Sequence, residues 1–581
     1  MRKIFNQTTL KQTFLTLCMI AVLHPVLSQQ IKETGGPYKY SIQKKSSGSK
    51  GAVVSAHPLA SKAGLDILRK GGNAIDAAIA TQLALAVVYP GAGNIGGGGF
   101  LVASLADGKT LAIDYREKAP AAAHRDMYLD SAGNARIQLS QSGHLASGVP
   151  GTIAGLFTSH KYAKLPFTEL IQPAIELAEK GFVITASEAS SLNSTKSAFI
   201  QHNTQPNAFV RERTWKAGDT LVQTDLANTL KRVKEQGMKG FYEGETARLI
   251  VEEMKRGKGL ITYDDLKNYT AKEREAIRFP YKEYTIITMP LPSSGGLIIQ
   301  QALKILETRD LAKMGFHTPA SVQLITEIER RAYADRAEFM GDADFVKVPV
   351  KTLVSEAYLK ERMKTYEAGK AGKSSAIRAG NINAESEETT HLSVADQWGN
   401  AVSVTTTLNG GYGSRTVVGG AGFLLNNEMD DFSVKPGIPN MYGAIGAEAN
   451  AIAPGKRMLS SMTPTIVLRK DKPYLVIGTP GGTTIPTSVL QTILNILEFN
   501  LSTEDAVNKP KFHHQWLPDM IMVENSFPQD VIDSLKAMGY EVNKRGQIGR
   551  TEVIKITRPK KNKMVFEAVG DIRGDDDAKA Y

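Results

Sequence analysis

The sequence predicts a chain that mixes helices and strands, of the α/β or α+β class, on three observations. Residues 150–380 are largely helical by their apolar periodicity. Beyond Thr389 the apolar period changes to two, which is typical of strands. No internal repeat is visible in the 581 residues. The alternation of helical and extended blocks therefore indicates a mixed fold.

The first predicted elements are two helices followed by a strand. Residues 60–70 show a helical pattern that a Gly-Gly pair ends. Asn73 then caps a second helix through residue 88, whose richness in Ala and Leu predicts burial. Four glycines, residues 96–99, precede the apolar run 100–105. No Lys-Ser/Thr pair follows them as a phosphate-binding loop requires, so we interpret them as backbone crowding beside a buried strand.

Four more helices and two hairpins follow along the chain. Helical patterns cover residues 167–180, 223–236, 295–307 and 485–499. Strands 391–395 and 401–408 flank a turn and form one hairpin, and strands 465–468 and 474–477 form another. The stretch 368–376 between the helical and extended blocks is small and polar, which is typical of a linker or an exposed loop.

The first 28 residues have the pattern of a cleaved secretory signal peptide. Arg2, Lys3 and Lys11 supply positive charge, and the apolar stretch 14–23 is too short to span a bilayer. An uncleaved anchor is the alternative. No later segment reads as transmembrane, so we expect a periplasmic or secreted protein without stable membrane association.

Composition excludes several function classes. Hydrophobic residues make up 42% and charged residues 22%, as in an ordinary soluble protein. The net charge is +11, but the basic residues are scattered, so we expect no nucleic-acid binding. The one cysteine, Cys18, lies in the signal, which excludes disulfides and a cysteine nucleophile in the mature chain. His513 and His514 are neighbours that face opposite ways on a strand, so we expect no shared metal site there. The sequence implies no metal and no organic cofactor.

A hydroxyl-rich segment opens the extended block at Thr389. A threonine hydroxyl is a weak nucleophile unless a base lies beside it, and the α-amino group of an N-terminal threonine is such a base. Its reference pKa of about 7.7–8.0 is close to neutral. This amine exists only if the bond before Thr389 is cut. Adjacent threonines at a strand start also follow from β-propensity alone, so the pattern by itself leaves both interpretations open.

The residue types expected near Thr389 favour its interpretation as a nucleophile. Thr407 lies on the return strand of the same hairpin, where its hydroxyl can reach Thr389. The turn of Gly481 and Gly482 ends a strand before a helix, and its N–H groups are suited to hold an anion. Further small donors and carboxylates lie at Ser460-Ser461 and in the segment 427–431.

Several long motifs, in order, resemble those of the γ-glutamyltranspeptidases. They are Asp114-Tyr-Arg-Glu117, the glycine run, Thr389-Thr-His, Leu408-Asn409, Leu425-Asn-Asn-Glu-Met-Asp-Asp-Phe432, Leu459-Ser-Ser-Met462, Pro480-Gly-Gly482 and Phe512-His-His-Gln-Trp-Leu-Pro518. The resemblance covers nearly the whole mature chain. It implies an N-terminal nucleophile hydrolase with a four-layer αββα sandwich. It also implies cleavage between Glu388 and Thr389, which yields a large subunit, 29–388, and a small catalytic subunit, 389–581, as a heterodimer within one αββα unit.

The resemblance further implies residue roles. Thr389 attacks a γ-glutamyl amide to form an ester, Thr407 holds Thr389, and the N–H groups of Gly481 and Gly482 stabilise the oxyanion. The substrate α-carboxylate binds Arg116 with Ser460 and Ser461, its α-ammonium binds Asn409, Glu428 and Asp431, and Tyr442 belongs to a lid. Gly570-Asp-Ile-Arg573 departs from the Asp-Pro-Arg of the family, which leaves the role of Arg573 undefined.

The expected activity is therefore γ-glutamyl transfer from glutathione and related compounds to water or to an amino-acid or peptide acceptor. Two alternatives keep the fold and the cleavage but change the substrate: a cephalosporin-type acylase and a poly-γ-glutamate hydrolase. A third is a non-enzymatic periplasmic solute-binding protein, which predicts one intact chain.

Overall fold

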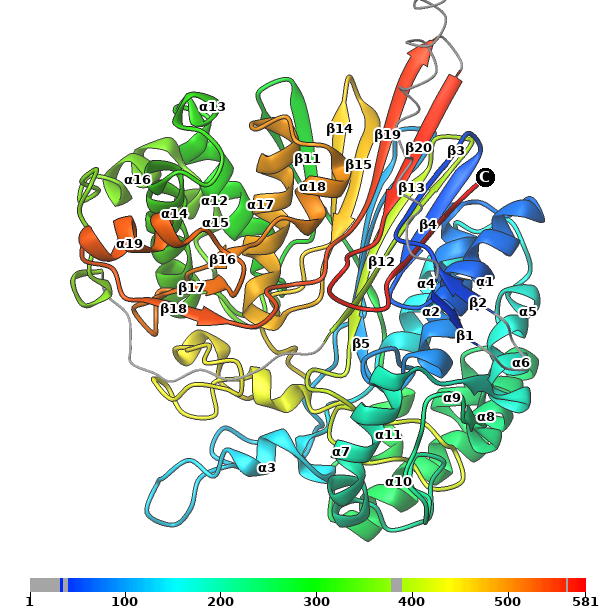
Figure 1. Ribbon diagram of the computed structural model, residues 1–581. Coiled ribbons are helices and arrows are strands. Elements are labelled where there is room, and N and C mark those ends of the chain that lie inside the picture. The colour runs from blue at the N-terminus through cyan, green and yellow to red at the C-terminus, as the bar shows by residue number, and fades with distance from the viewer. Residues whose placement is uncertain (1–31, 35–39, 378–388, 561–562) are drawn as a thin grey trace, which may run out of the picture.

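Two antiparallel sheets of seven strands each lie face to face at the centre of the molecule (Figure 1). The computed structural model describes residues 32–34, 40–377, 389–560 and 563–581. The predicted signal peptide, 1–28, and Glu388 lie outside the described residues. The first sheet has the order β21 (Asp577–Ala580), β4 (Gly51–Ser55), β12 (Thr390–Asp396), β13 (Ala401–Thr407), β5 (Gly98–Ser104), β6 (Thr110–Asp114) and β9 (Lys272–Arg274). The second has the order β10 (Ile277–Tyr281), β11 (Tyr284–Thr288), β14 (Thr465–Arg469), β15 (Lys472–Gly478), β19 (Glu552–Lys560), β20 (Lys563–Val569) and β3 (Lys45–Gly48).

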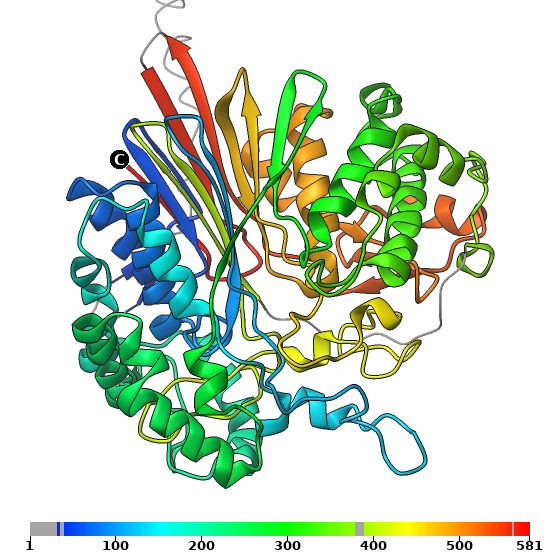
Figure 2. The same ribbon diagram turned by 180° about the vertical axis from the view of Figure 1, so that it is seen from behind.

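A layer of helices covers the outer face of each sheet, as both ribbon views show (Figures 1 and 2). The first sheet carries α1 (Pro58–Arg69), α2 (Ala74–Val88), α4 (Thr152–His160), α5 (Phe167–Leu170), α6 (Gln172–Lys180), α7 (Ala186–His202), α8 (Thr224–Gln236), α9 (Lys239–Tyr242), α10 (Gly244–Gly257) and α11 (Tyr263–Lys267). The second carries α12 (Gly295–Leu306), α13 (Leu311–Met314), α14 (Pro319–Phe339), α15 (Val350–Leu353), α16 (Glu356–Arg362), α17 (Ile485–Leu497), α18 (Thr503–Asn508) and α19 (Gln529–Ala537). The predicted αββα sandwich is confirmed.

Smaller elements complete the chain at the edges of the sandwich. They are the pairs β1 (Lys32–Thr34) with β2 (Tyr40–Ile42) and β7 (Phe182–Val183) with β8 (Thr220–Leu221), the three-stranded sheet β16 (Phe512–His513), β17 (Ile521–Glu524) and β18 (Val542–Arg545), and α3 (Gln138–Gln141). Short 3₁₀ turns include Glu428–Asp431 and Gly482–Thr484.

The four inner strands β4, β12, β13 and β5 of the first sheet are buried on both faces, and their side chains alternate between two cores. On β4, Val53 packs with the helices while Val54 packs toward the second sheet. On β13, Val402 and Val404 face the helices and Ala401 faces the other way. In these strands the period of two separates side chains that pack against the helices from side chains that pack against the second sheet. It does not separate a buried face from a solvated one.

Strands from before and after Thr389 alternate within this sheet. The strand β12 pairs with β4, with Leu392 opposite Ser55, and β13 pairs with β5, with Thr407 opposite Gly98. The second sheet is mixed in the same way, because β14 pairs with β11. Both large sheets therefore contain strands from before and after residue 389, and both sides of the predicted cut contribute to one sandwich.

Most local expectations match the structure. Asn73 caps α2, accepting from the N–H of Asp76 at 3.1 Å while the carboxylate of Asp76 accepts from the N–H of Asn73 at 2.7 Å. All fifteen residues of α2 are buried, and no helix among the described residues has the length and apolarity that crossing a membrane requires. The glycine run is crowded as expected, because a Cβ on Gly97 would lie 2.1 Å from the carbonyl oxygen of Thr407.

One helix prediction is wrong in detail. The segment 167–180 is two helices, α5 and α6, which meet at Ile171. Pro173 lies in the first turn of α6, where its missing N–H costs nothing, whereas a continuous helix would leave the carbonyl of Glu169 without its donor. The periodicity of the segment did not register this break.

Candidate active site

The ends of several strands bring the predicted site together at one edge of the sandwich. Thr389 immediately precedes β12, and the pairing of Thr390 with Thr406 places it beside Thr407, the last residue of β13. The side-chain amide of Asn94 donates to the carbonyl of Thr407 at 2.9 Å and so holds the end of β13. The hydroxyl of Thr407 accepts from the N–H of Asn409 at 2.7 Å, which leaves its own proton free to be donated.

A small cavity of about 20 Å³ lies against Thr389. It is lined by most of the residues predicted from the sequence: Arg116, Thr407, Asn409, Glu428, Asp431, Tyr442, Ser460, Ser461 and Gly482. Thr389 itself is 6% exposed. The structure thus gathers side chains that are up to several hundred positions apart in the chain, and we call this space the charged cavity.

Arg116 is the centre of the charged cavity. It follows the end of β6 and is only 1% exposed. Its Nη1 lies 2.5 Å from a carboxylate oxygen of Glu428, and its Nη2 donates to Asp431. Burial lowers the pKa of Arg116, but the charges of Glu428 and Asp431 outweigh this effect and hold it above the usual value. The predicted cation and the predicted anions therefore neutralise one another in this structure.

The carboxylates are strongly perturbed by their surroundings. Burial raises the pKa of Glu428 and of Asp431, while the charge of Arg116 opposes the shift in both. Asp431 also accepts from the side-chain amide of Asn440 at 2.9 Å. The charge of Arg116, which both carboxylates share, is the main interaction that stabilises their ionised forms, and a second cation would be well accommodated between them.

Two charged residues of the site were not predicted. Glu117 lies 3.5 Å from Arg116 and is fully buried, and burial raises its pKa to about 8. It stands in the Asp-Tyr-Arg-Glu motif, so the signal was present in the sequence. Arg336, on α14, donates to the hydroxyl of Ser461 at 3.3 Å and lines the charged cavity. No local signal distinguishes this arginine from the others of that helix.

Gly481 and Gly482 form the turn between β15 and α17. Gly481 has a φ of +135° and Gly482 a φ of +47°, conformations that side chains on Cβ disfavour. Among the described residues, neither N–H group donates to an acceptor, whereas the carbonyl of Gly481 accepts from the N–H of Thr484 at 2.8 Å. Gly482 lines the charged cavity, and Gly481 lines the neighbouring one.

Tyr442 closes the charged cavity on the side of the predicted lid. Its hydroxyl donates to the carbonyl of Asn409, and it is 5% exposed. The preceding residue, Met441, donates its N–H to Asp430 at 2.8 Å, so the lid segment is anchored on the same 3₁₀ turn that carries Glu428 and Asp431. Burial raises the pKa of Asp430 to about 7.

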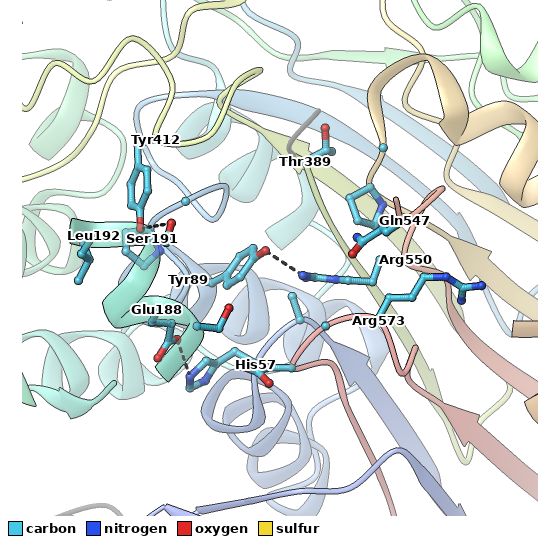
Figure 3. Close-up of a pocket in the computed structure, with 18 of the residues that line it drawn as sticks. His57, Tyr89, Glu188, Ser191, Leu192, Thr389, Tyr412, Gln547, Arg550 and Arg573 are labelled. Atoms are coloured by element: carbon cyan, nitrogen blue, oxygen red, sulfur yellow. Dashed lines mark hydrogen bonds and ion pairs between the residues drawn. The ribbon is translucent and has the colours of Figure 1, made fainter. Parts of the chain in front are cut away.

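A second, larger cavity of about 750 Å³ adjoins the first (Figure 3). Its walls come from α7, from the segments 545–550 and 572–575, and from Tyr89. In the view of Figure 3, Thr389 lies above Tyr89 and Arg550, while His57 and Glu188 lie below them. Thr389 alone, among the described residues, lines both cavities. This peptide-sized space had no counterpart in the sequence motifs.

Hydrogen bonds and ion pairs within the fold hold three of the histidines and Arg573 in place. Burial lowers the pKa of His391 to about 3, and its ring nitrogens bond to Thr405 and Ser393. His513 bonds to Thr487, whereas the Nδ1 of His514 accepts from the N–H of Trp516. In the described part of the chain no three His, Cys, Asp or Glu side chains form a metal-binding group. Arg573 binds Glu524 with two nitrogens, at 2.7 and 2.6 Å, and so ties the C-terminal segment to β17.

Comparison with known proteins agrees with this geometry. The family model for gamma-glutamyltranspeptidase matches residues 60–581. The glutathione hydrolase proenzyme of Escherichia coli K12 is 47% identical over 510 residues, which cover 87% of this chain and 88% of that protein. The acylase ACY 1 proenzyme of Pseudomonas sp. SE83 is 37% identical, with coverage of 86% and 88%.

Two solved structures share the fold. The cephalosporin acylase of Bacillus halodurans superposes with a TM-score of 0.82 at 26% identity, over 95% of this chain and 99% of that one. The Helicobacter pylori gamma-glutamyltranspeptidase has a TM-score of 0.55 at 41% identity, over 61% of this chain and 97% of that one. With the match across residues 60–581, these likenesses show that the chain belongs to the gamma-glutamyltranspeptidase family.

Proposed function

We propose that this chain is a self-processing γ-glutamyltransferase and glutathione hydrolase whose nucleophile is Thr389. The observation that carries the proposal is the position of Thr389 between a cavity with paired charges and a peptide-sized cavity. A γ-glutamyl peptide has two such parts, a zwitterionic head and a peptide tail, with the scissile amide between them. The names of relatives such as the Escherichia coli proenzyme support the same activity.

The residues around Thr389 supply each part of an acyl transfer. Once the bond to Glu388 is cut, the α-amino group of Thr389 takes the proton from its own Oγ, which attacks the γ-carbonyl. The amide nitrogen leaves with that proton, and a γ-glutamyl ester remains on Thr389. The N–H groups of Gly481 and Gly482 stabilise the oxyanion, and each such donor contributes about 3–4 kcal/mol to lowering the barrier. Thr407 orients Thr389.

The charged cavity selects the head of the substrate. The α-carboxylate binds Arg116 with help from Ser460 and Ser461, and the α-ammonium binds Asn409, Glu428 and Asp431. When the zwitterionic head binds, its carboxylate and its ammonium take the places that the protein's own carboxylates and Arg116 have in their mutual ion pairs. Every buried charge therefore keeps a partner of opposite sign. Only a γ-linked glutamate has both groups free on one carbon, which explains a preference for γ-amides.

The mature protein is a heterodimer of residues 29–388 and 389–581 that is exported across a membrane. The interleaved strands of both sheets support a stable association, because separating the two parts would break the pairs of β12 with β4 and of β13 with β5. The export follows from the pattern of residues 1–28, which predicts a periplasmic or secreted protein.

Sequencing the fragments of the purified protein tests the proposal. We expect two bands on a denaturing gel, with Thr389 as the N-terminal residue of the smaller one, and hydrolysis of a γ-glutamyl anilide. Thr389→Ala abolishes both. Thr390→Ala is the matched control, since the hydroxyl of Thr390 is buried without a hydrogen-bond partner among the described residues, and it retains both. A wild-type chain that stays intact and inactive would refute the proposal.

An acylase is the second candidate, because the cephalosporin acylase fold superposes over 95% of this chain. The two functions differ in the acyl head, and a glutaryl anilide differs from a γ-glutamyl anilide only in lacking the α-amino group. If Glu428 and Asp431 hold an ammonium, the γ-glutamyl compound is preferred by about tenfold to a hundredfold in kcat/KM. Equal rates would favour the acylase.

A further inference from the structure

The lid and the oxyanion turn meet at one buried side chain, that of Gln515. This residue follows β16 and is 6% exposed. Its Nε2 donates to the carbonyl oxygen of Tyr442 in the lid at 3.3 Å, and its Oε1 accepts from the hydroxyl of Thr483 at 2.6 Å. Thr483 is the middle residue of the 3₁₀ turn Gly482–Thr484 and lines the charged cavity. A single amide therefore joins two parts of the active site that lie far apart in the chain.

The orientation of the Gln515 amide follows from its partners. The carbonyl of Tyr442 only accepts, so the amide nitrogen faces it and the amide oxygen faces Thr483. The Nε2 of His513 lies 2.9 Å from the same oxygen. Burial lowers the pKa of His513 to about 3, so its ring is neutral near pH 7; it donates through Nε2, and Nδ1 accepts from the hydroxyl of Thr487 at 2.9 Å. Rotation of the amide would break all three of its contacts at once.

The oxyanion turn is held on both sides of Thr483. Its hydroxyl bonds to Gln515, and its carbonyl accepts from the hydroxyl of Tyr333 on α14. Gly482 is the preceding residue, so a shift of Thr483 tilts the N–H of Gly482. A donor in an oxyanion hole stabilises the developing charge only when it is aimed at it. The restraint on Thr483 therefore bears on catalysis, although neither Gln515 nor Tyr333 lines the charged cavity.

The lid packs against the same amide. Ile445 in the lid belongs to the apolar cluster that contains Trp516, the neighbour of Gln515. Ile445, Gln515 and Thr483 also line a cavity of about 10 Å³, which has room for at most one water molecule. Moving the lid away opens this space to solvent, and water then competes for the hydrogen bonds of the amide.

We propose that Gln515 is a positioning residue that links the lid to the oxyanion turn. With the lid closed, the carbonyl of Tyr442 fixes the amide, and the amide holds Thr483 and with it the N–H of Gly482. When the lid opens, the bond to Tyr442 breaks, the amide turns toward water and Thr483 loses its restraint. This inference rests on the proposed function. Formation and breakdown of the γ-glutamyl ester both pass through an oxyanion, so the closed lid favours both steps.

The first test removes the bond between Gln515 and Thr483 from either end. Thr483→Val keeps the shape of the side chain but lacks the hydroxyl, and Gln515→Leu lacks the amide. With a γ-glutamyl anilide as donor, we expect each change to lower kcat, per molecule of processed enzyme, about tenfold. KM stays within about twofold of wild type, because the contacts to the glutamyl head remain. The double variant loses no more than the single ones, since both remove one bond.

Two further variants distinguish positioning from general damage to the fold. Thr483→Ser keeps the hydroxyl, and we expect it to restore kcat to within about threefold of wild type. Thr492→Val is the matched control. Thr492 is buried on α17, and its hydroxyl donates to the carbonyl of Ser488 at 2.8 Å, away from the lid and the oxyanion turn. It should retain both kcat and KM.

A variant within the lid tests the link itself. Ile445 is buried but does not line the charged cavity, so Ile445→Ala loosens the packing of the lid without touching the glutamyl head. We expect Ile445→Ala to lower kcat about threefold in the wild-type background. In the Thr483→Val background it should have no further effect, because the lid can then no longer act on the turn through Gln515.

The outcomes separate this inference from the proposed function. If wild-type protein is neither processed nor active on the anilide, the proposed function fails. If wild-type protein is active but Thr483→Val keeps kcat within about twofold, or the losses in Thr483→Val and Gln515→Leu multiply in the double variant, Gln515 does not position the turn. An equal loss from Ile445→Ala in both backgrounds would show that the lid does not act through this bond, and it would overturn the link.

Discussion

Replacing Arg116 by lysine tests whether the geometry of this cation, and not only its charge, holds the substrate. Arg116 contacts Glu428 through Nη1 and Asp431 through Nη2, and its Nε donates to the carbonyl of Met458 at 3.3 Å. Lysine has one nitrogen at the end of a flexible chain and cannot make two parallel bonds to one carboxylate. In Arg116→Lys the positive charge remains but one charge-assisted hydrogen bond to the substrate is lost.

The size of the effect follows from the burial of the site. Arg116 is 1% exposed, so its hydrogen bonds are screened little by water. One hydrogen bond to a charged group contributes about 1.5–3 kcal/mol, and each 1.4 kcal/mol is tenfold. We therefore expect kcat/KM for a γ-glutamyl anilide to fall by about tenfold to a hundredfold, mainly through KM.

A second arginine provides the control for stability. Arg274 also bridges two carboxylates, those of Asp114 at 2.7 Å and Asp344 at 2.8 Å, but it does not line either cavity. Arg274→Lys should lower the melting temperature and leave KM unchanged. The gel pattern shows whether each variant is processed. An Arg116→Lys protein that is cleaved normally and keeps kcat/KM within twofold of wild type would refute the proposed role of Arg116.

Three further predictions concern the oxyanion turn, the lid and pH. Gly481→Ala places a Cβ at a φ of +135°, where a side chain costs about 1–3 kcal/mol, and tilts its N–H, so kcat should fall about a hundredfold with little change in KM. Tyr442→Phe removes the bond to the carbonyl of Asn409, and fluorescence-monitored stopped flow should then show faster donor binding, whereas an unchanged rate would mean that the lid does not limit entry. Burial raises the pKa of Asp430 to about 7, so the native state binds more protons than the unfolded state between about pH 4 and 7. The contribution of Asp430 to stability therefore falls as pH rises through this window, and Asp430→Asn should remove that part of the dependence of melting temperature on pH; equal slopes in both proteins would exclude a contribution from Asp430.

Local structure was largely predictable because it depends on neighbours in the chain. The cap at Asn73, the buried α2 and the hairpin of β12 and β13 follow from side-chain periodicity and from short polar residues at element ends. The exception is the break between α5 and α6. It follows from the missing N–H of Pro173, which the apolar periodicity of the segment does not reveal.

The sequence by itself predicted Thr389 as the nucleophile and most of the residues around the charged cavity, through motifs that resemble those of one family and occur in the same order. Only the tertiary structure decided that Arg116 is paired with Glu428 and Asp431, that Arg336 joins them, and that a second cavity opens beside Thr389. These features depend on which distant surfaces meet, because α7, the loop after β18 and the C-terminal segment contribute walls from separate parts of the chain. Periodicity reports which face of an element is buried, whereas the partner of that face is set by the packing of the whole sandwich.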